Sequence, residues 1–165
     1  MWELLMAASV MFPNIHARDL DGHEVQTDAL RGAPVVYLLG FTYESRHDVE
    51  AWGAFFASQP HGPRTVQMPV YDGLAVLARR WIDGSMARNT PAAVHPDVLT
   101  TTDRAPLVGG LHLKDPNARA TAVLVDRAGW VVALERGAPT PAARQRFLEA
   151  LHDLAARPDG AGPRE

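Results

Sequence analysis

The densest group of side chains that can do chemistry is the polar run Glu44-Ser-Arg-His-Asp48. Glu44, His47 and Asp48 supply two carboxylates and an imidazole, and the two acids stand four residues apart, on one face if the segment is helical. Oxygen-rich ligands of this kind suit a hard or borderline divalent ion better than copper(I), which prefers sulfur. The same acids are also favoured at a helix N-terminus without any ligand. The spacing therefore leaves a metal site and a capped helix start as alternatives.

The neighbouring Ser45 adds a hydroxyl, but it does not make a nucleophilic pair with His47. Side chains two residues apart on a helix do not face each other, so the histidine cannot take the proton of that serine. Ser45 instead matches a helix N-cap, and Asp48 three residues later completes an approximate capping box. We therefore expect helix-start chemistry here and no catalytic residue.

Two elements must position this run. The apolar segment Val35–Leu39 predicts a central strand that is buried on both faces. After the polar run, the apolar residues recur at helical spacing and predict a helix with one buried face. A second strand follows at 65–70, where Pro69 favours a position at the edge of the sheet.

The remaining elements are predicted from turn and capping signals. Asp21-Gly22 lies between two short apolar runs and indicates an N-terminal hairpin. An apolar stripe at helical spacing predicts a second helix that begins after Asp72, with Trp81 in the core. Its residues are Leu74, Leu77, Ala78, Trp81 and Ile82. Residues 83–117 form a long connection that we expect to be ordered by short elements of its own. A hairpin over 120–135 and a last helix, with Thr140 as its cap and Pro141 at its first position, end the pattern.

Composition narrows the range of functions. The chain has 165 residues, a formal charge of −3 and no cysteine. The charge gives no reason to expect a nucleic acid partner, and the absence of cysteine excludes disulfides, thiolate metal sites and iron–sulfur clusters within this sequence. The N-terminal segment, expected as a strand or helix packed on the domain, lacks the pattern of a targeting signal, and its apolar run is too short for a membrane span. We expect one domain over 1–156, a mobile tail over 157–165 and a cytoplasmic location.

The order of these elements, with two parallel strands first and an antiparallel pair last, predicts an α/β fold. It resembles the thioredoxin-like superfamily over roughly residues 12 to 156, with an N-terminal hairpin in front. Phe12-Pro13 and the hairpin after it look like the front of peroxiredoxin and TlpA-type proteins, and Val123-Leu-Val-Asp-Arg-Ala-Gly-Trp130 resembles their terminal hairpin. The resemblance implies a mixed central sheet with flanking helices.

The resemblance also assigns a position to the polar run. Gly40-Phe-Thr-Tyr43 is similar to the segment that leads into the metal site of Sco-type copper chaperones, whose two cysteines match Glu44 and Asp48. Redox members carry their reactive cysteines in this loop, and only a thiolate can exchange disulfides or reduce peroxide in that way. The resemblance therefore implies that the loop Thr42-Tyr-Glu-Ser-Arg-His-Asp48 is a former active site without thiol chemistry.

The groove opposite this loop is expected to be altered as well. Redox members place a cis-proline before the strand that begins at Thr121, and the matching residue here is Ala120. A cis bond without proline costs about 2.5–4 kcal/mol, so a trans bond is expected. We predict an apolar groove formed by Tyr43 and the segment Arg119-Ala-Thr121, with Arg46, Arg119 and Arg127 at its rim. Phe41 and Trp130 are assigned to the core.

A third relative points to a function. The segments Gly40-Phe41, Leu77-Ala-Arg-Arg-Trp-Ile82 and Thr90-Pro-Ala-Ala-Val-His95 resemble, in order, features of the ATP synthase assembly-chaperone family, which needs no redox cysteines. This resemblance implies a non-catalytic protein-binding or assembly-chaperone role, no cofactor, and a protein partner such as a subunit of a membrane complex. The alternative is a metal- or small-ligand-binding protein that uses Glu44, His47 and Asp48.

Overall fold

The computed structural model describes residues 10–157. The N-terminal segment up to residue 9 and the tail from residue 158, both named above, lie outside the described residues. The strands are β1 His16–Arg18, β2 Glu24–Gln26, β3 Val35–Gly40, β4 Arg64–Pro69, β5 Thr100–Thr101, β6 Thr121–Val125 and β7 Val131–Arg136. The helices are α1 Arg46–Ala57, α2 Leu74–Leu77, α3 Arg79–Asn89, α4 Arg104–Gly110 and α5 Pro141–Ala156, with 3-10 turns η1 Thr27–Leu30 and η2 Ala92–Asp97.

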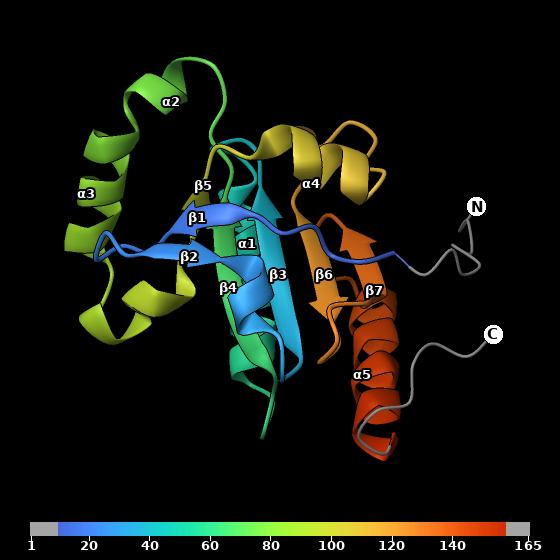
Figure 1. Cartoon of the computed structure of the whole chain (residues 1–165). Coiled ribbons are helices and arrows are strands. Elements are labelled where there is room, and N and C mark those ends of the chain that lie inside the picture. Colours follow the sequence, from blue (N-terminus) through green and yellow to red (C-terminus); the bar gives the residue numbers. More distant parts are fainter. Residues whose placement is uncertain (1–9, 158–165) are drawn as a thin grey trace.

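A four-stranded sheet in the order β4-β3-β6-β7 forms the centre of the molecule (Figure 1). β3 pairs in parallel with β4 and antiparallel with β6, which in turn pairs antiparallel with β7. The first five residues of β3 are buried, as the continuous apolar run predicts for a central strand. Pro69 ends the edge strand β4, which confirms the position that its missing N–H requires.

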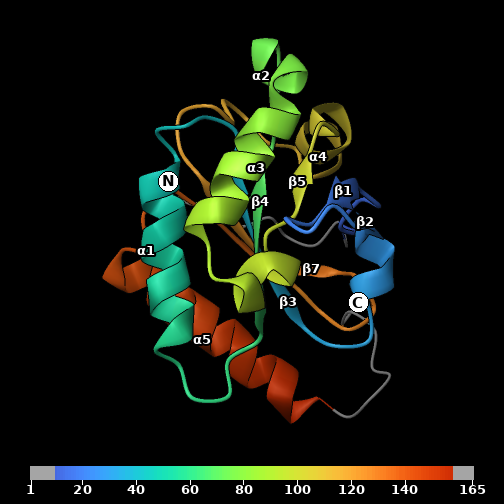
Figure 2. The same cartoon turned by 90° about the vertical axis from the view of Figure 1, so that its left-hand side faces the viewer.

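Each face of the sheet packs against its own layer (Figure 2). On one face, α1 and α5 contribute Trp52, Phe56 and Phe147 to a core with Val36 and Leu38. The opposite face is covered by α4, η1 and the N-terminal hairpin. The mixed sheet with flanking helices is therefore confirmed.

The N-terminal hairpin is confirmed, and it joins a sheet of its own. β1 pairs antiparallel with β2, and Gly22 has the positive φ of +89° that this turn requires. β1 also pairs with β5, which lies in the long connection after α3. This pairing was not predicted, because a two-residue strand carries no periodic signal. It shows how the 83–117 connection is ordered by short elements.

The last helix begins as its capping residues predict. The hydroxyl oxygen of Thr140 accepts a hydrogen bond from the backbone N–H of Ala143 at 3.2 Å, and Pro141 is the first residue of α5. Phe147 is fully buried, whereas Leu148 is 41% exposed. The sequence thus places the start of α5 correctly, and of these two adjacent apolar residues only Phe147 lies in the core.

The buried stripe predicted for the second helix is wrong. Leu74 is 83% exposed, Leu77 85% and Trp81 73%, and no residue of α2 or α3 is buried. The two faces of the central sheet are already covered, so α2 and α3 stand beyond the edge strand β4 (Figure 1). Spacing predicts that an apolar stripe exists, but not what covers it.

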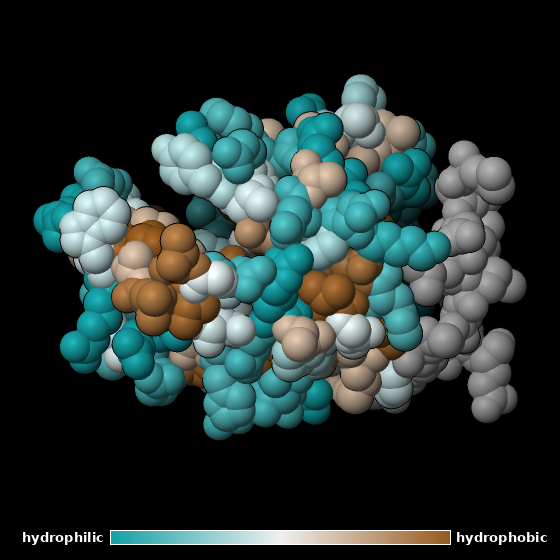
Figure 3. All heavy atoms as spheres, turned by 90° about the horizontal axis from the view of Figure 1, so that it is seen from above, coloured by the Kyte–Doolittle hydropathy of each residue, from teal (hydrophilic) through white to brown (hydrophobic). Residues whose placement is uncertain are grey.

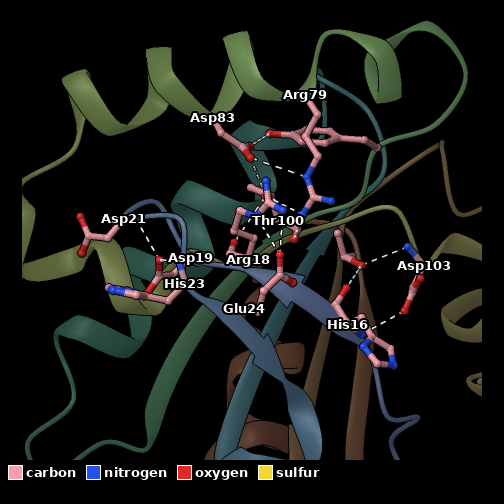
Figure 4. Close-up of polar contacts among 12 residues, drawn as sticks. His16, Arg18, Asp19, Asp21, His23, Glu24, Arg79, Asp83, Thr100 and Asp103 are labelled. Atoms are coloured by element: carbon pink, nitrogen blue, oxygen red, sulfur yellow. Dashed lines mark hydrogen bonds and ion pairs between the residues drawn. The ribbon is translucent and has the colours of Figure 1, made fainter.

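Polar contacts hold α3 to the body. The Tyr71 hydroxyl donates to Asp83 Oδ1 at 2.8 Å, and the Thr100 hydroxyl donates to Asp83 Oδ2 at 3.1 Å. The Arg79 guanidinium donates to the carbonyl oxygen of Thr100 at 2.7 Å (Figure 4). Burial and the hydrogen bond to Asp83 raise the pKa of Tyr71 far above its ordinary value. The helix is therefore attached by its polar side.

His95 fastens the other end of α3. Its Nδ1 lies 2.7 Å from a carboxylate oxygen of Asp21, and its Nε2 lies 3.0 Å from the carbonyl oxygen of Thr90 and 3.2 Å from that of Ala87. All three partners accept hydrogen bonds, so both ring nitrogens must donate and the ring is cationic. The hydrogen bond to Asp21 is the main cause that raises the pKa of His95 above its ordinary 6.5.

We expect this contact to weaken in alkaline solution. Because the pKa of His95 is raised by folding, its contribution to stability is complete below the ordinary value of 6.5 and is lost as pH rises through the raised value. Urea unfolding of the wild type and of His95→Gln should therefore differ more at pH 6 than at pH 9. His112→Gln, at an exposed histidine, is the control. A difference that is the same at both pH values would contradict the cationic assignment.

Candidate functional site

The polar 42–48 loop connects the end of β3 to the first turn of α1. Gly40 ends the strand where the chain folds back on itself, and a Cβ there would lie 3.0 Å from Ser45 Oγ. The Ser45 hydroxyl donates to the carbonyl oxygen of Thr42 at 2.6 Å. Ser45 is the residue before the helix, as predicted, but it makes no side-chain cap hydrogen bond. Its hydroxyl closes the loop instead of capping the helix.

Asp48 does not act as the acid of a capping box either. Its two carboxylate oxygens accept a pair of hydrogen bonds from the Arg119 guanidinium at 2.7 and 2.8 Å, and one of them also accepts from the backbone N–H of Ala120 at 3.3 Å. These contacts, with that of Arg119 the largest, hold the pKa of Asp48 below its usual range. The pair ties the start of α1 to the segment before β6, 71 residues away. Sequence reasoning named both residues but missed their pairing, because no local pattern links them.

The metal site expected from Glu44, His47 and Asp48 does not form. Glu44 and His47 are exposed, and Asp48 is buried and engaged with Arg119. Within residues 10–157, the three side chains that come close enough to share an ion are Asp19, Asp21 and His23. Asp19 already accepts from the backbone N–H groups of Asp21 and His23 and contacts the His23 ring at 3.0 Å (Figure 4). That cluster is thereby explained as a hairpin turn.

Two of the three residues expected to line the groove opposite the loop are buried. Ala120 is 1% exposed and Thr121 is fully buried, so neither can line a groove. The chain from residue 10 to 157 contains no cis peptide bond, in agreement with the trans bond predicted before Ala120. Phe41 is 6% exposed, which confirms its place in the core, whereas Trp130 is only partly buried. A small hollow lies near the opposite end of β3, lined in part by Phe12, Thr27 and Tyr37, and includes no residue of the 42–48 loop.

What the loop does present is an aromatic ring under a cation. Tyr43 is 75% exposed, and the Arg46 guanidinium carbon lies 3.8 Å from the centre of its ring. Arg46 also donates to the carbonyl oxygen of Tyr43 at 3.3 Å, and Thr42 donates to that of Asn117 at 3.3 Å. The loop is thus braced on both sides while Tyr43 points outward. Glu44 and His47 lie exposed beside it.

Comparisons with known proteins place the fold. No family model matches the sequence, and no curated protein matches it. Among solved structures, BsSco, described as a member of the Sco family of cytochrome c oxidase assembly proteins, is similar with a TM-score of 0.61 and 14% identity, over 94% of this chain and 100% of that chain. The exposed lipoprotein thioredoxin Etrx1 of Streptococcus pneumoniae is similar with a TM-score of 0.57 and 10% identity, over 86% of this chain and 99% of that chain. A thiol peroxidase from Chromobacterium violaceum is similar with a TM-score of 0.53 and 18% identity, over 87% of this chain and 84% of that chain.

These similarities are structural, and they agree with the order of strands and helices described above. At 10–18% identity they establish the fold and leave the activity open. A thiol-dependent activity is excluded for this sequence by its lack of cysteine. None of the helices between residues 10 and 157 is long and apolar enough to cross a membrane. The chain is therefore a cysteine-free protein with the thioredoxin-like fold.

Proposed function

We propose that the protein is a non-catalytic protein-binding module that contacts its partner through the 42–48 loop, with Tyr43 at the centre of the contact. The observation that carries this proposal is the exposed Tyr43 ring, held beneath Arg46 at the place where redox relatives keep their cysteines. Tyrosine and arginine are enriched among the residues that dominate binding energy in protein interfaces. The loop keeps the position of a redox site and offers a recognition surface instead.

The bracing of the loop supports this proposal. The Ser45–Thr42 hydrogen bond and the Asp48–Arg119 pair fix the backbone on both sides of Tyr43. A surface that is already ordered before binding loses less conformational entropy when a partner arrives. Arg46 adds a cationic group over the Tyr43 ring, whereas the charge of Arg119 is paired with Asp48. A partner with an acidic residue beside an apolar or aromatic one would match this surface.

The identity of the partner is suggested by resemblance. The short motifs shared with ATP synthase assembly chaperones favour an assembly role and make a subunit of a membrane complex the first partner to test. The similarity to BsSco is consistent with an assembly role, since that protein is described as a member of a family that assembles cytochrome c oxidase.

A photo-crosslinking amino acid at position 43 tests the proposal in cells that express the protein. The same crosslinker at Leu148 of α5, which is also partly exposed, is the matched control. We expect one protein to crosslink from position 43 and not from 148, and to lose this crosslink when Arg46 is changed to alanine. Equal crosslinking from both positions would contradict a contact at the loop.

Binding to the crosslinked partner should depend strongly on the Tyr43 ring. Tyr43→Ala is expected to raise the dissociation constant about 30-fold, which corresponds to a loss of about 2 kcal/mol of binding free energy for a central interface aromatic. Tyr43→Phe should retain most of the affinity because the ring and its contact with Arg46 remain. Calorimetric titration measures both. Unchanged affinity in Tyr43→Ala would remove the loop from the interface.

A further inference from the structure

The largest exposed apolar side chains lie on a different surface. Leu74, Leu77 and Trp81 follow one another at i, i+3 and i+7 on α2 and α3, and all three are more than 70% exposed. Val76, also on α2, is 42% exposed. Figure 3 shows an apolar patch over α2 and α3, with polar side chains around it. We call Leu74, Leu77 and Trp81 the α2–α3 stripe.

The stripe cannot turn inward to bury itself. The inner side of the segment is bonded to the body through Asp83, which accepts from Tyr71 and Thr100, and through Arg79, which donates to Thr100. Rotating α3 toward the sheet would break these contacts and leave buried polar groups without partners, which is unfavourable. The polar attachment therefore holds the apolar side outward, in the arrangement expected of an interface.

The charges beside the stripe differ between its two ends. Asp72 precedes it, with a side chain that is 62% exposed, accepts a hydrogen bond from the backbone N–H of Gly73 at 2.7 Å and lies 3.6 Å from Arg104 Nε. Arg80 and Arg88 are exposed on α3, and neither has an ion pair within the described part of the chain. One end is thus acidic and the other basic. An identical stripe laid antiparallel against this one would place each acidic end beside the basic residues of the other.

We propose that this surface binds a second copy of the chain, with the two α2–α3 stripes packed antiparallel about a two-fold axis. Two-fold pairing uses the same patch on both copies, which requires a surface that is complementary to itself, and the charge pattern meets this requirement. Two copies of the stripe and Val76 would bury on the order of 1,000 Å², at the lower end of specific interfaces. The Tyr43 loop is not part of this contact, so the inference is independent of the proposed function.

Sedimentation velocity of the full chain over about 1 to 200 µM tests the proposal. A concentration-dependent dimer is expected, with at least 10-fold weaker association in Leu77→Gln/Trp81→Gln. Leu148→Gln, at another exposed leucine, should associate like the wild type. Circular dichroism checks folding, which the exposed positions should leave intact. A wild type that stays monomeric throughout overturns the proposal.

Charge exchange tests the antiparallel arrangement. Asp72→Arg and Arg88→Asp should each weaken the dimer several-fold, and the double variant should recover at least half of the lost association. Single variants that associate like the wild type, or no recovery in the double variant, would overturn the antiparallel arrangement. Vesicles with anionic lipid are tested in parallel. Stripe-dependent vesicle binding by a monomeric protein would assign the surface to a bilayer, and stripe-dependent capture of another protein would assign it to that partner.

Discussion

Replacing Trp52 with alanine should lower the free energy of unfolding by about 4 kcal/mol, the largest loss that we expect from a single substitution. Trp52 is fully buried, stacks on Phe56 with ring centres 5.6 Å apart, and lies 4.9 Å from Phe147. Its removal would leave a cavity between α1 and α5 that rigid sheet residues cannot fill. Urea unfolding monitored by far-ultraviolet circular dichroism measures the loss.

A second substitution separates packing from hydrogen bonding at this position. The Trp52 indole N–H donates to the carbonyl oxygen of Gly137 at 2.8 Å, in the turn between β7 and α5. Trp52→Phe keeps an aromatic ring but loses this donor and some volume, so it should cost about 2 kcal/mol. If Trp52→Ala cost less than 1 kcal/mol, the core between the sheet and its two helices would be wrong as described.

Replacing Asp48 with alanine should lower the free energy of unfolding by about 2 kcal/mol at neutral pH. The substitution removes the acceptor of the paired hydrogen bonds from Arg119 and of the bond from Ala120. Glu50→Ala, on the same helix but exposed, is the control and should have little effect. Asp48→Asn keeps one acceptor oxygen, so its loss of stability should lie between those of Asp48→Ala and Glu50→Ala. Chemical unfolding of the four proteins checks this order.

The contribution of Asp48 to the free energy of unfolding should decrease in acidic solution. Its pKa is lower in the folded protein than the ordinary value of 3.8, chiefly because of the hydrogen bonds from Arg119. Its charge therefore adds stability above that value, and the addition is lost as pH falls through the lowered pKa. The stability difference between wild type and Asp48→Asn should be complete at pH 7 and shrink below about pH 4. Asp19 and Glu24 also have lowered pKa values, so only this difference isolates Asp48. A difference that persists unchanged at pH 2.5 would contradict the ion pair.

Several elements could be predicted from local residues because their signals are local. The apolar run of β3, the Asp21-Gly22 turn and the Thr140-Pro141 helix start each depend on backbone preferences within a few residues. Their order along the chain then suffices to indicate the thioredoxin-like arrangement. The absence of cysteine likewise excludes thiol chemistry whatever the fold.

The candidate site could be predicted only in outline. Sequence predicts that Asp48 is an acid at the start of a helix, and it does lie in the first turn of α1. Its carboxylate, however, is held by Arg119 and neither completes a capping box nor joins a group of metal ligands among residues 10–157. Its partner Arg119 is 71 residues away and becomes a neighbour only because β6 lies beside β3. A charged side chain is satisfied by whichever opposite charge the fold brings near, and spacing along the chain carries no record of that.

The difference in burial between Trp81 and Trp52 likewise comes from the tertiary structure. Both stand in apolar stripes of helical spacing, and the sequence alone determines that each helix has an apolar side. Tertiary structure decided that α1 covers the central sheet while α2 and α3 extend beyond its edge, so Trp52 is fully buried and Trp81 is 73% exposed. Periodicity depends on a helix's own geometry, whereas burial depends on which surfaces of the sheet other elements have already covered.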